Sequence, residues 1–157
     1  MRSRRGSGGD RLSASPDLQR FRDAQAGGTY ARALAELRAG RKTGHWMWFI
    51  FPQLSGLGRS ATARHYALQS LAHARAYLAD PVLGPRLRGS CQALLGLPAG
   101  ATAEGVLGSI DALKLRSCAT LFARAGAEEG VFGDILERFY GGGHDEATLR
   151  LLERASG

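Results

Sequence analysis

Apolar residues recur every three to four positions along most of the chain, which is the spacing of one face of an α-helix. Two short stripes begin and end the pattern, around Leu18 and Phe21 and around Leu149 and Leu152. Between them lie five further stripes: Tyr30, Leu34 and Leu37; Leu71, Ala74 and Leu78; Leu83, Leu87, Cys91 and Leu94; Leu115, Cys118 and Phe122; and Phe132, Ile135, Leu136 and Phe139. No segment outside residues 44–53 alternates with period two. The pattern predicts an all-α fold, a compact single-domain bundle of short helices that share one core.

Residues at the ends of these stripes indicate where helices begin. Ser70 is a predicted N-cap, because its hydroxyl can accept a hydrogen bond from a free backbone N–H, and Asp145 is predicted to open the last helix.

His73 stands on the polar side of its helix and is interpreted as a surface residue. Arg32 and Glu36 are four residues apart outside an apolar stripe, so we expect an ion pair on the helix surface.

The chain divides into a short extension and one domain. Residues 1–15 combine Gly, Ser and Arg with one large aliphatic residue. This is too little apolar surface to offset the entropy of ordering, so we expect a disordered basic N-terminal extension. Residues 16–155 are expected to form a single helical domain, and a chain of 157 residues is long enough to bury one core.

The composition indicates a soluble protein of the cytoplasm. The chain is 44% hydrophobic and 22% charged, and no apolar run reaches the roughly 20 residues of a membrane span. The N-terminus is basic, but no apolar run follows it, so no secretory signal is evident. Cys91 and Cys118 lie on predicted apolar stripes and form no CxxC pair, which favours two packed thiols in a reducing compartment. We expect no metal site, no cofactor and no membrane partner.

The formal charge of +7 is compatible with an anionic partner. Lys42 and Lys114 are the only lysines, and all other Lys and Arg positions are arginine, a bias that looks like genomic base composition. Four arginines fall in residues 1–15. One hypothesis is therefore a nucleic-acid-binding module that uses this tail and scattered domain arginines, although no helix carries a dense basic stripe.

The segment GHWMWFIFPQ, residues 44–53, concentrates four aromatic residues within the six positions 46–51. Core packing explains most of its apolar content. His45 at one end and Gln53 at the other are polar groups that packing does not require, and His45 is a candidate general acid or base. Trp46 and Trp48 offer flat faces to the planar part of a ligand.

The stretch QLSGLGRSATARHY, which follows, is typical of a tight loop that leads into a helix. Gly56 and Gly58 allow tight turns, Arg59 comes next, and Ser60 can cap a helix that runs through Tyr66. Such a loop can present backbone N–H groups and a guanidinium to an anion. A loop that merely leads into a helix explains the same residues, and no Walker or dinucleotide fingerprint is present.

A third set of candidates lies in GSIDALKLRS, residues 108–117. Asp111 stands near the start of a predicted helix, where its charge suits the helix dipole, and Lys114 and Arg116 follow on the polar side. A solvated polar face accounts for the same charges. Lys114 differs from its surroundings because the chain otherwise prefers arginine, which indicates a role that arginine would not fill.

These segments, together with LQRFRDAQ and SLAHARAYLADPVLGPRL, resemble the bacterial family known as domain of unknown function 1810, from about Leu18 to Leu152. The resemblance implies a small, mainly α-helical, intracellular domain and no established activity. Some members carry the label calpastatin, which does not fit this chain, because calpastatin-like inhibitors are disordered and repetitive. The family typically reads Pro-Asp-Asp-Leu-Lys where this chain has Ile-Asp-Ala-Leu-Lys at residues 110–114. Only one of two carboxylates, Asp111, therefore remains.

The leading hypothesis is a pocket for a small anionic or nucleotide-like ligand, with an enzymatic role left open. The ligand-binding candidates are Trp46, Trp48, Arg59, Ser60, Tyr66, Lys114 and Arg116. The candidates for proton transfer or orientation are His45, Gln53 and Asp111. The hypothesis expects four side chains to converge on one cavity beside Trp46, namely His45, Gln53, Arg59 and Lys114. The alternatives are the nucleic-acid-binding module and a protein-interaction module that docks through an exposed aromatic segment.

Overall fold

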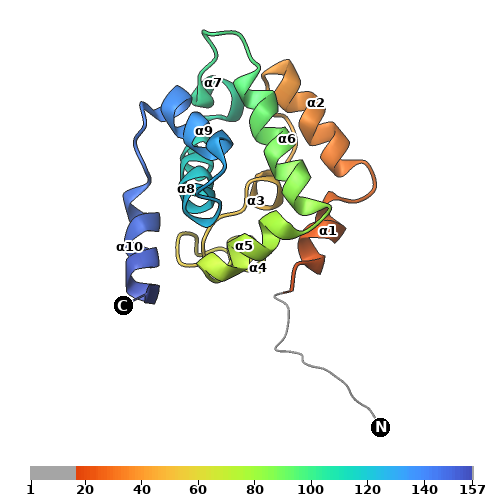
Figure 1. Ribbon diagram of the computed structural model, residues 1–157. Coiled ribbons are helices and arrows are strands. Elements are labelled where there is room, and N and C mark those ends of the chain that lie inside the picture. The colour runs from red at the N-terminus through yellow and green to blue at the C-terminus, as the bar shows by residue number, and fades with distance from the viewer. Residues whose placement is uncertain (1–16, 157) are drawn as a thin grey trace.

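The structure, a computed structural model, describes residues 17–156. This part of the chain contains ten helices (Figure 1). In chain order they are α1 (Gln19–Gln25), α2 (Thr29–Ala39), α3 (Met47–Ile50), α4 (Ala61–His65), α5 (Leu71–Ala79), α6 (Leu83–Leu95), α7 (Ala103–Leu107), α8 (Ser109–Ala125), α9 (Gly130–Tyr140) and α10 (Glu146–Ser156). Within these residues there is no strand, only an isolated parallel bridge between Leu54 and Leu68. The all-α prediction is confirmed. The extension predicted for residues 1–15 lies outside the described residues.

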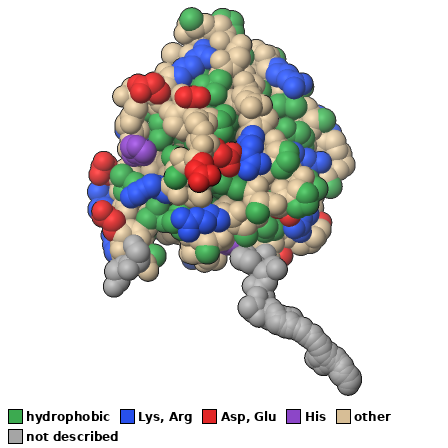
Figure 2. All heavy atoms as spheres, in the orientation of Figure 1, with side chains coloured by type: hydrophobic (Ala, Val, Ile, Leu, Met, Phe, Trp, Pro, Cys, Tyr) green, Lys and Arg blue, Asp and Glu red, His purple; other side chains and the backbone are tan. Residues whose placement is uncertain are grey.

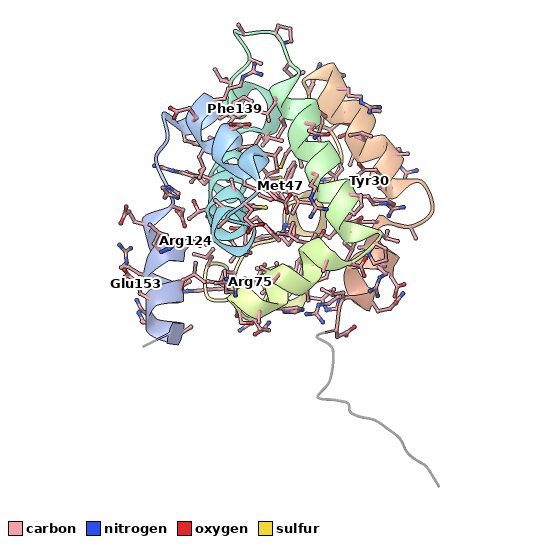
Figure 3. All side chains as sticks on the ribbon, viewed as in Figure 1. Tyr30, Met47, Arg75, Arg124, Phe139 and Glu153 are labelled. Carbon is pink, nitrogen blue, oxygen red and sulfur yellow. The ribbon has the colours of Figure 1, made fainter. Side chains whose placement is uncertain are left out.

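Helix α8 is the longest of these helices and forms the centre of the bundle. It packs against α5, α7, α9 and α10, while α6 packs against α2, α5 and α9. The short helix α3 lies near the middle of the bundle in Figure 1 and contacts α1 and α6. Figure 3 shows Met47, its first residue, among the surrounding helices, and the Met47 side chain is buried. The aromatic segment therefore runs through the inside of the fold. None of the helices described here is long and apolar enough to cross a membrane.

A series of aromatic contacts joins four helices through the core. The ring centroids of Phe21 in α1 and Tyr77 in α5 are 5.3 Å apart. Phe122 in α8 lies 5.6 Å from Tyr77 and 5.5 Å from Phe132 in α9. All four side chains are fully buried. Because helices this short gain little stability from their own propensity, such contacts between helices hold them in place.

The predicted N-caps are confirmed. The hydroxyl of Ser70 accepts a hydrogen bond from the backbone N–H of His73 at 3.0 Å, at the start of α5. The carboxylate of Asp145 accepts one from the backbone N–H of Thr148 at 3.0 Å, at the start of α10. Each cap satisfies an N–H group that has no partner within its own helix. These helix starts are thus decided by residues close together in the sequence.

Both cysteines are buried, as their positions on apolar stripes predicted. Burial raises the pKa of the Cys91 thiol to about 12 and raises the pKa of the Cys118 thiol well above its ordinary value. A thiol that keeps its proton is a poor nucleophile. Cys91 and Cys118 therefore act as small apolar side chains of the core.

His73 is buried, so the prediction that it is a surface residue is wrong. The residue is 5% exposed. Its Nδ1 accepts a hydrogen bond from the backbone N–H of Gln69 at 3.0 Å, and its Nε2 lies 3.2 Å from the carbonyl oxygen of Asp17. The segment before α1 covers the ring, and helical periodicity does not reveal a contact between such distant parts of the chain.

Folding stability is expected to fall as the pH drops below about 6.5, because His73 is held neutral. Burial lowers the pKa of the His73 imidazole from its ordinary 6.5. Between the lowered pKa and 6.5, the unfolded chain binds a proton that the folded chain does not, so stability is complete above 6.5 and declines toward the lowered pKa. Urea unfolding of the wild type and His73→Gln at about pH 7.5 and about pH 5.5 measures this. The variant should show the smaller pH dependence, and equal slopes would exclude His73 as the source.

Candidate functional site

A pocket of about 240 Å³ opens where the loop after α3 meets the beginnings of α8 and α10. Three segments that are far apart in the sequence therefore contribute to it. Its lining residues are Trp48, Gln53, Leu57, Gly58, Ile110, Leu113, Lys114, Ser117, Asp145 and Ala147. We call it the Lys114 pocket. It combines an aromatic wall, several apolar side chains and a small number of polar groups, as ligand pockets commonly do.

The loop between α3 and α4 takes its course from a proline and a glycine. Pro52 helps to end α3, because its ring disfavours a helical residue before it. A β-carbon on Gly58 would lie 2.6 Å from the β-carbon of Ala63 and 3.3 Å from the Trp48 ring, so the close approach requires glycine. This course of the loop brings Gln53 next to α8.

Gln53 is the most informative polar residue of the pocket. It is 8% exposed, and its side-chain Nε2 is buried with no hydrogen-bond partner within the described residues. Its backbone carbonyl accepts a hydrogen bond from the N–H of Leu68 at 2.9 Å, which holds the residue in place. An unsatisfied buried donor costs about 1–3 kcal/mol, so this amide gains stability from an acceptor that the described residues do not supply.

The ammonium group of Lys114 makes two specific contacts at the wall of the pocket. Its Nζ is 4.0 Å from the centroid of the Trp48 ring and donates a hydrogen bond to Asp111 Oδ1 at 3.0 Å. The other lysine of the chain, Lys42, lies 3.0 Å from Asp111 Oδ2 and 5.2 Å from the ring of Trp46. Both lysines of the sequence thus meet at one carboxylate, and each lies over one of the two tryptophans.

Asp111 is held in its ionised form between the two lysines. Burial by itself would raise its pKa, but the hydrogen bonds from Lys114 and Lys42 outweigh burial and lower the pKa of this carboxyl. An ionised carboxylate that bridges two ammonium groups orients them. Asp111 does not line the pocket itself. Asp111 therefore orients Lys114 without lining the pocket.

Trp46 belongs to the core and not to the Lys114 pocket. It is 3% exposed, and its indole N–H donates to Glu36 Oε1 at 2.9 Å. The same oxygen accepts the backbone N–H groups of Thr43 at 2.7 Å and Gly44 at 2.9 Å. Burial opposes the ionisation of Glu36, but these hydrogen bonds outweigh it and lower the pKa of the carboxyl to about 2. The predicted ion pair with Arg32 is replaced by this set of three donors.

Several predicted site residues lie outside the Lys114 pocket, among them His45, a candidate for proton transfer, and the ligand-binding candidates Arg59, Ser60 and Tyr66. His45 is exposed before α3, and Arg59 is exposed in the loop before α4. Ser60 accepts the backbone N–H of Ala63 at 3.1 Å and caps α4. Tyr66 borders a neighbouring space of about 10 Å³, which is about the room that one water needs and which Gln53 and Trp48 also line.

The expected convergence of four side chains is found for two of them. Gln53 and Lys114 both line the pocket, while His45 and Arg59 do not. The cavity lies beside Trp48, which is half-buried, and not beside Trp46. The aromatic segment is likewise no exposed docking surface, because most of its large side chains are buried or half-buried.

The pocket has an apolar rim and an acidic residue that were not among the site residues predicted from the sequence. Ile110 and Leu113 are 70% and 64% exposed, although both are large apolar residues. The sequence did carry a signal for them, because they are three residues apart and neither belongs to the apolar stripe of α8 that faces the core. Asp145 also lines the pocket, and no local pattern indicated that the start of α10 would reach α8.

Several arginine side chains of the domain bind the protein itself. Arg88 donates to both oxygens of Glu129, at 2.6 and 2.9 Å, and Arg138 donates to backbone carbonyls after the end of α6. Arg116, a predicted ligand-binding residue, donates to the carbonyl of Gly143 at 3.0 Å. On the face drawn in Figure 2, the basic side chains are interspersed with acidic and apolar ones. These contacts give little support to binding of nucleic acid.

The fold and the site together define a small all-α domain whose pocket combines a lysine, a buried amide and an apolar rim. A family model described as protein of unknown function (DUF1810) matches residues 15–152, so the chain belongs to this family. The family resemblance read from the sequence is thereby confirmed.

A solved structure shows the same fold. The crystal structure of the conserved hypothetical protein Rv1873 from Mycobacterium tuberculosis is 48% identical in sequence, with a TM-score of 0.84. The similarity covers 87% of this chain and 96% of that chain. No curated protein matches the chain. The likeness to this crystal structure agrees with the all-α fold of the chain.

Proposed function

We propose that the protein binds a small anionic ligand in the Lys114 pocket. The observation that carries the proposal is the side-chain amide of Gln53, whose Nε2 is buried without a partner among the described residues. Gln53 lines the same pocket as the ammonium group of Lys114. Acceptor oxygens of one ligand would satisfy the amide and bind the ammonium together.

The charges behind the pocket support an anion. Lys42 and Lys114 carry one positive charge each and Asp111 carries one negative charge, so this cluster is positive by one, while the carboxylate of Asp145 also lines the pocket. Its carboxylate stays ionised at neutral pH because the two lysines lower its pKa. A cation held in a partly enclosed site attracts an anion more strongly than the same cation in water.

Trp48 supports the site differently from the role that the sequence indicated. The ammonium of Lys114 lies over its ring at 4.0 Å, so a cation–π contact already uses that face. In this arrangement Trp48 holds Lys114 in place, and stacking of a planar ligand on two tryptophans has no support, because Trp46 is buried elsewhere. The proposal is therefore for recognition of an anionic group.

Gln53→Met is expected to remove ligand binding without loss of folding stability. Methionine fills a similar volume and removes the buried unsatisfied amide, so the free energy of unfolding should stay equal or rise by about 1 kcal/mol. Thermal unfolding with inorganic phosphate, AMP or 4-methylpentanoate measures binding. A ligand at about 100 times its Kd stabilises a protein by about 2.7 kcal/mol. In a domain of this length, this raises Tm by about 5–10 °C.

Arg59→Ala is the matched control, because Arg59 is exposed and does not line the pocket. The wild type and this variant should show the same rise in Tm with the anion that binds, whereas Gln53→Met and Lys114→Met should show none. The proposal fails if none of the three anions raises Tm, or if the rise persists in both pocket variants.

A further inference from the structure

An apolar rim stands next to the two donors of the Lys114 pocket. Within the described residues, three large apolar side chains are exposed, and two of them, Ile110 and Leu113, line this pocket. They lie one turn apart on α8, and Leu57 and Ala147 line the same pocket. Exposed apolar side chains that gather at one site beside polar groups mark a surface that binds a partly apolar partner.

The polar part of the pocket fits a group with one negative charge. Two lining residues carry donors, the ammonium of Lys114 and the buried amide of Gln53, whose Nε2 has no partner within residues 17–156, and two donors suit the two oxygens of a carboxylate. The cluster of Lys42, Asp111 and Lys114 is positive by only one, and the carboxylate of Asp145 also lines the pocket. A second negative charge on the ligand would be repelled by Asp145 and lack a cation of its own.

We infer that the ligand is an aliphatic monocarboxylate. Its carboxylate lies between Lys114 Nζ and Gln53 Nε2, and its branched aliphatic group packs on Ile110 and Leu113. This inference rests on the proposed function, because it specifies the anion that the Lys114 pocket takes. The same chemistry occurs in a free branched-chain acid and in the C-terminus of a peptide that ends in leucine.

The test compares an acid with its uncharged amide by isothermal titration calorimetry. The probes are 4-methylpentanoate, 4-methylpentanamide and inorganic phosphate. The acid should bind the wild type at least about tenfold more tightly than the amide, because a hydrogen bond to a charged group is the stronger kind. Lys114→Met should remove this preference.

A second variant tests the apolar rim independently. Ile110→Ser combined with Leu113→Ser should weaken binding of the acid by about tenfold or more, since the exposed side chains lose their apolar contact with the ligand. The variant should keep the Tm of the wild type, because both residues are exposed and surface substitutions change stability little.

The source of the carboxylate is distinguished with two peptides, Ala-Ala-Leu with a free and with an amidated C-terminus. Tighter binding of the free-ended peptide than of 4-methylpentanoate assigns the pocket to a chain terminus, and the reverse order assigns it to a small acid. Equal affinity for the acid and the amide overturns the inference, as does the absence of acid binding. If phosphate or AMP raises Tm through Gln53 and Lys114 while the acid does not bind, the inference falls and the proposed function stands.

Discussion

Replacing Gly84 with alanine is expected to lower the free energy of unfolding by about 3 kcal/mol, although alanine is the better helix former. Gly84 lies in the first turn of α6 and is buried. A β-carbon there would overlap the backbone carbonyl oxygen of Leu78 in α5, and it would lie 2.8 Å from the guanidinium of Arg88. Because the obstacle is backbone, α5 and α6 would have to move apart. Thermal unfolding should show a loss of about 6–12 °C in Tm.

Gly133→Ala is the control for this prediction. Gly133 lies within α9, is exposed, and a β-carbon there meets nothing within 4 Å. Alanine should therefore raise the free energy of unfolding by about 0.5–1 kcal/mol through helix propensity alone. Opposite signs for the two substitutions would show that close packing of α5 on α6 is the cause. A Gly84→Ala protein as stable as the wild type would contradict this close packing of α5 on α6.

Glu36→Gln is expected to cost about 2 kcal/mol at neutral pH, the second largest effect. The Glu36 carboxylate accepts the N–H groups of Thr43, Gly44 and the Trp46 indole. A neutral amide oxygen can accept the same groups, but hydrogen bonds to an ionised acceptor are about twice as strong. The loop that carries Lys42 toward Asp111 would lose its anchor. Urea unfolding followed by tryptophan fluorescence measures the difference.

The same substitution should flatten the acid dependence of stability. The pKa of Glu36 falls from 4.5 to about 2 on folding. Its contribution is complete above 4.5 and is lost as the pH falls toward 2, where the carboxylate gains a proton. The wild type should therefore lose more stability than Glu36→Gln over this range. Glu137→Gln, which alters an exposed carboxylate on α9, should behave as the wild type does. A wild-type slope in Glu36→Gln would rule out the proposed cause.

The helices could be predicted because their signals are local. Apolar stripes at helical spacing and capping residues such as Ser70 and Asp145 act over a few positions, and the structure has helices at these places. The same local reasoning was wrong for His73 and for the partner of Glu36. Both residues look like surface groups on an isolated helix, and both are bonded to segments that lie beyond that helix.

At the candidate site, the type of a residue predicted its place in the pocket better than its closeness in the sequence to other candidates did. The rarity of lysine indicated a special place for Lys114, and the structure shows both lysines of the chain at Asp111. Gln53 stood out as a polar end of an apolar segment, and its buried amide is what core packing leaves unexplained. Arg59 and His45 had equally suitable chemistry, yet the loop course places them outside the pocket.

The sequence by itself determined the fold class, the family, the cysteine environment and two of the pocket's polar residues, because each follows from local spacing or residue type. Only the tertiary structure decided which candidates meet. The Lys114 pocket joins the loop after α3 with the starts of α8 and α10. These segments are separated by tens of residues, and their approach depends on helix packing and on one glycine, Gly58, that lets the loop lie against Trp48. No pattern within a single helix carries that information, since a side chain's neighbours across the fold are set by how whole helices pack.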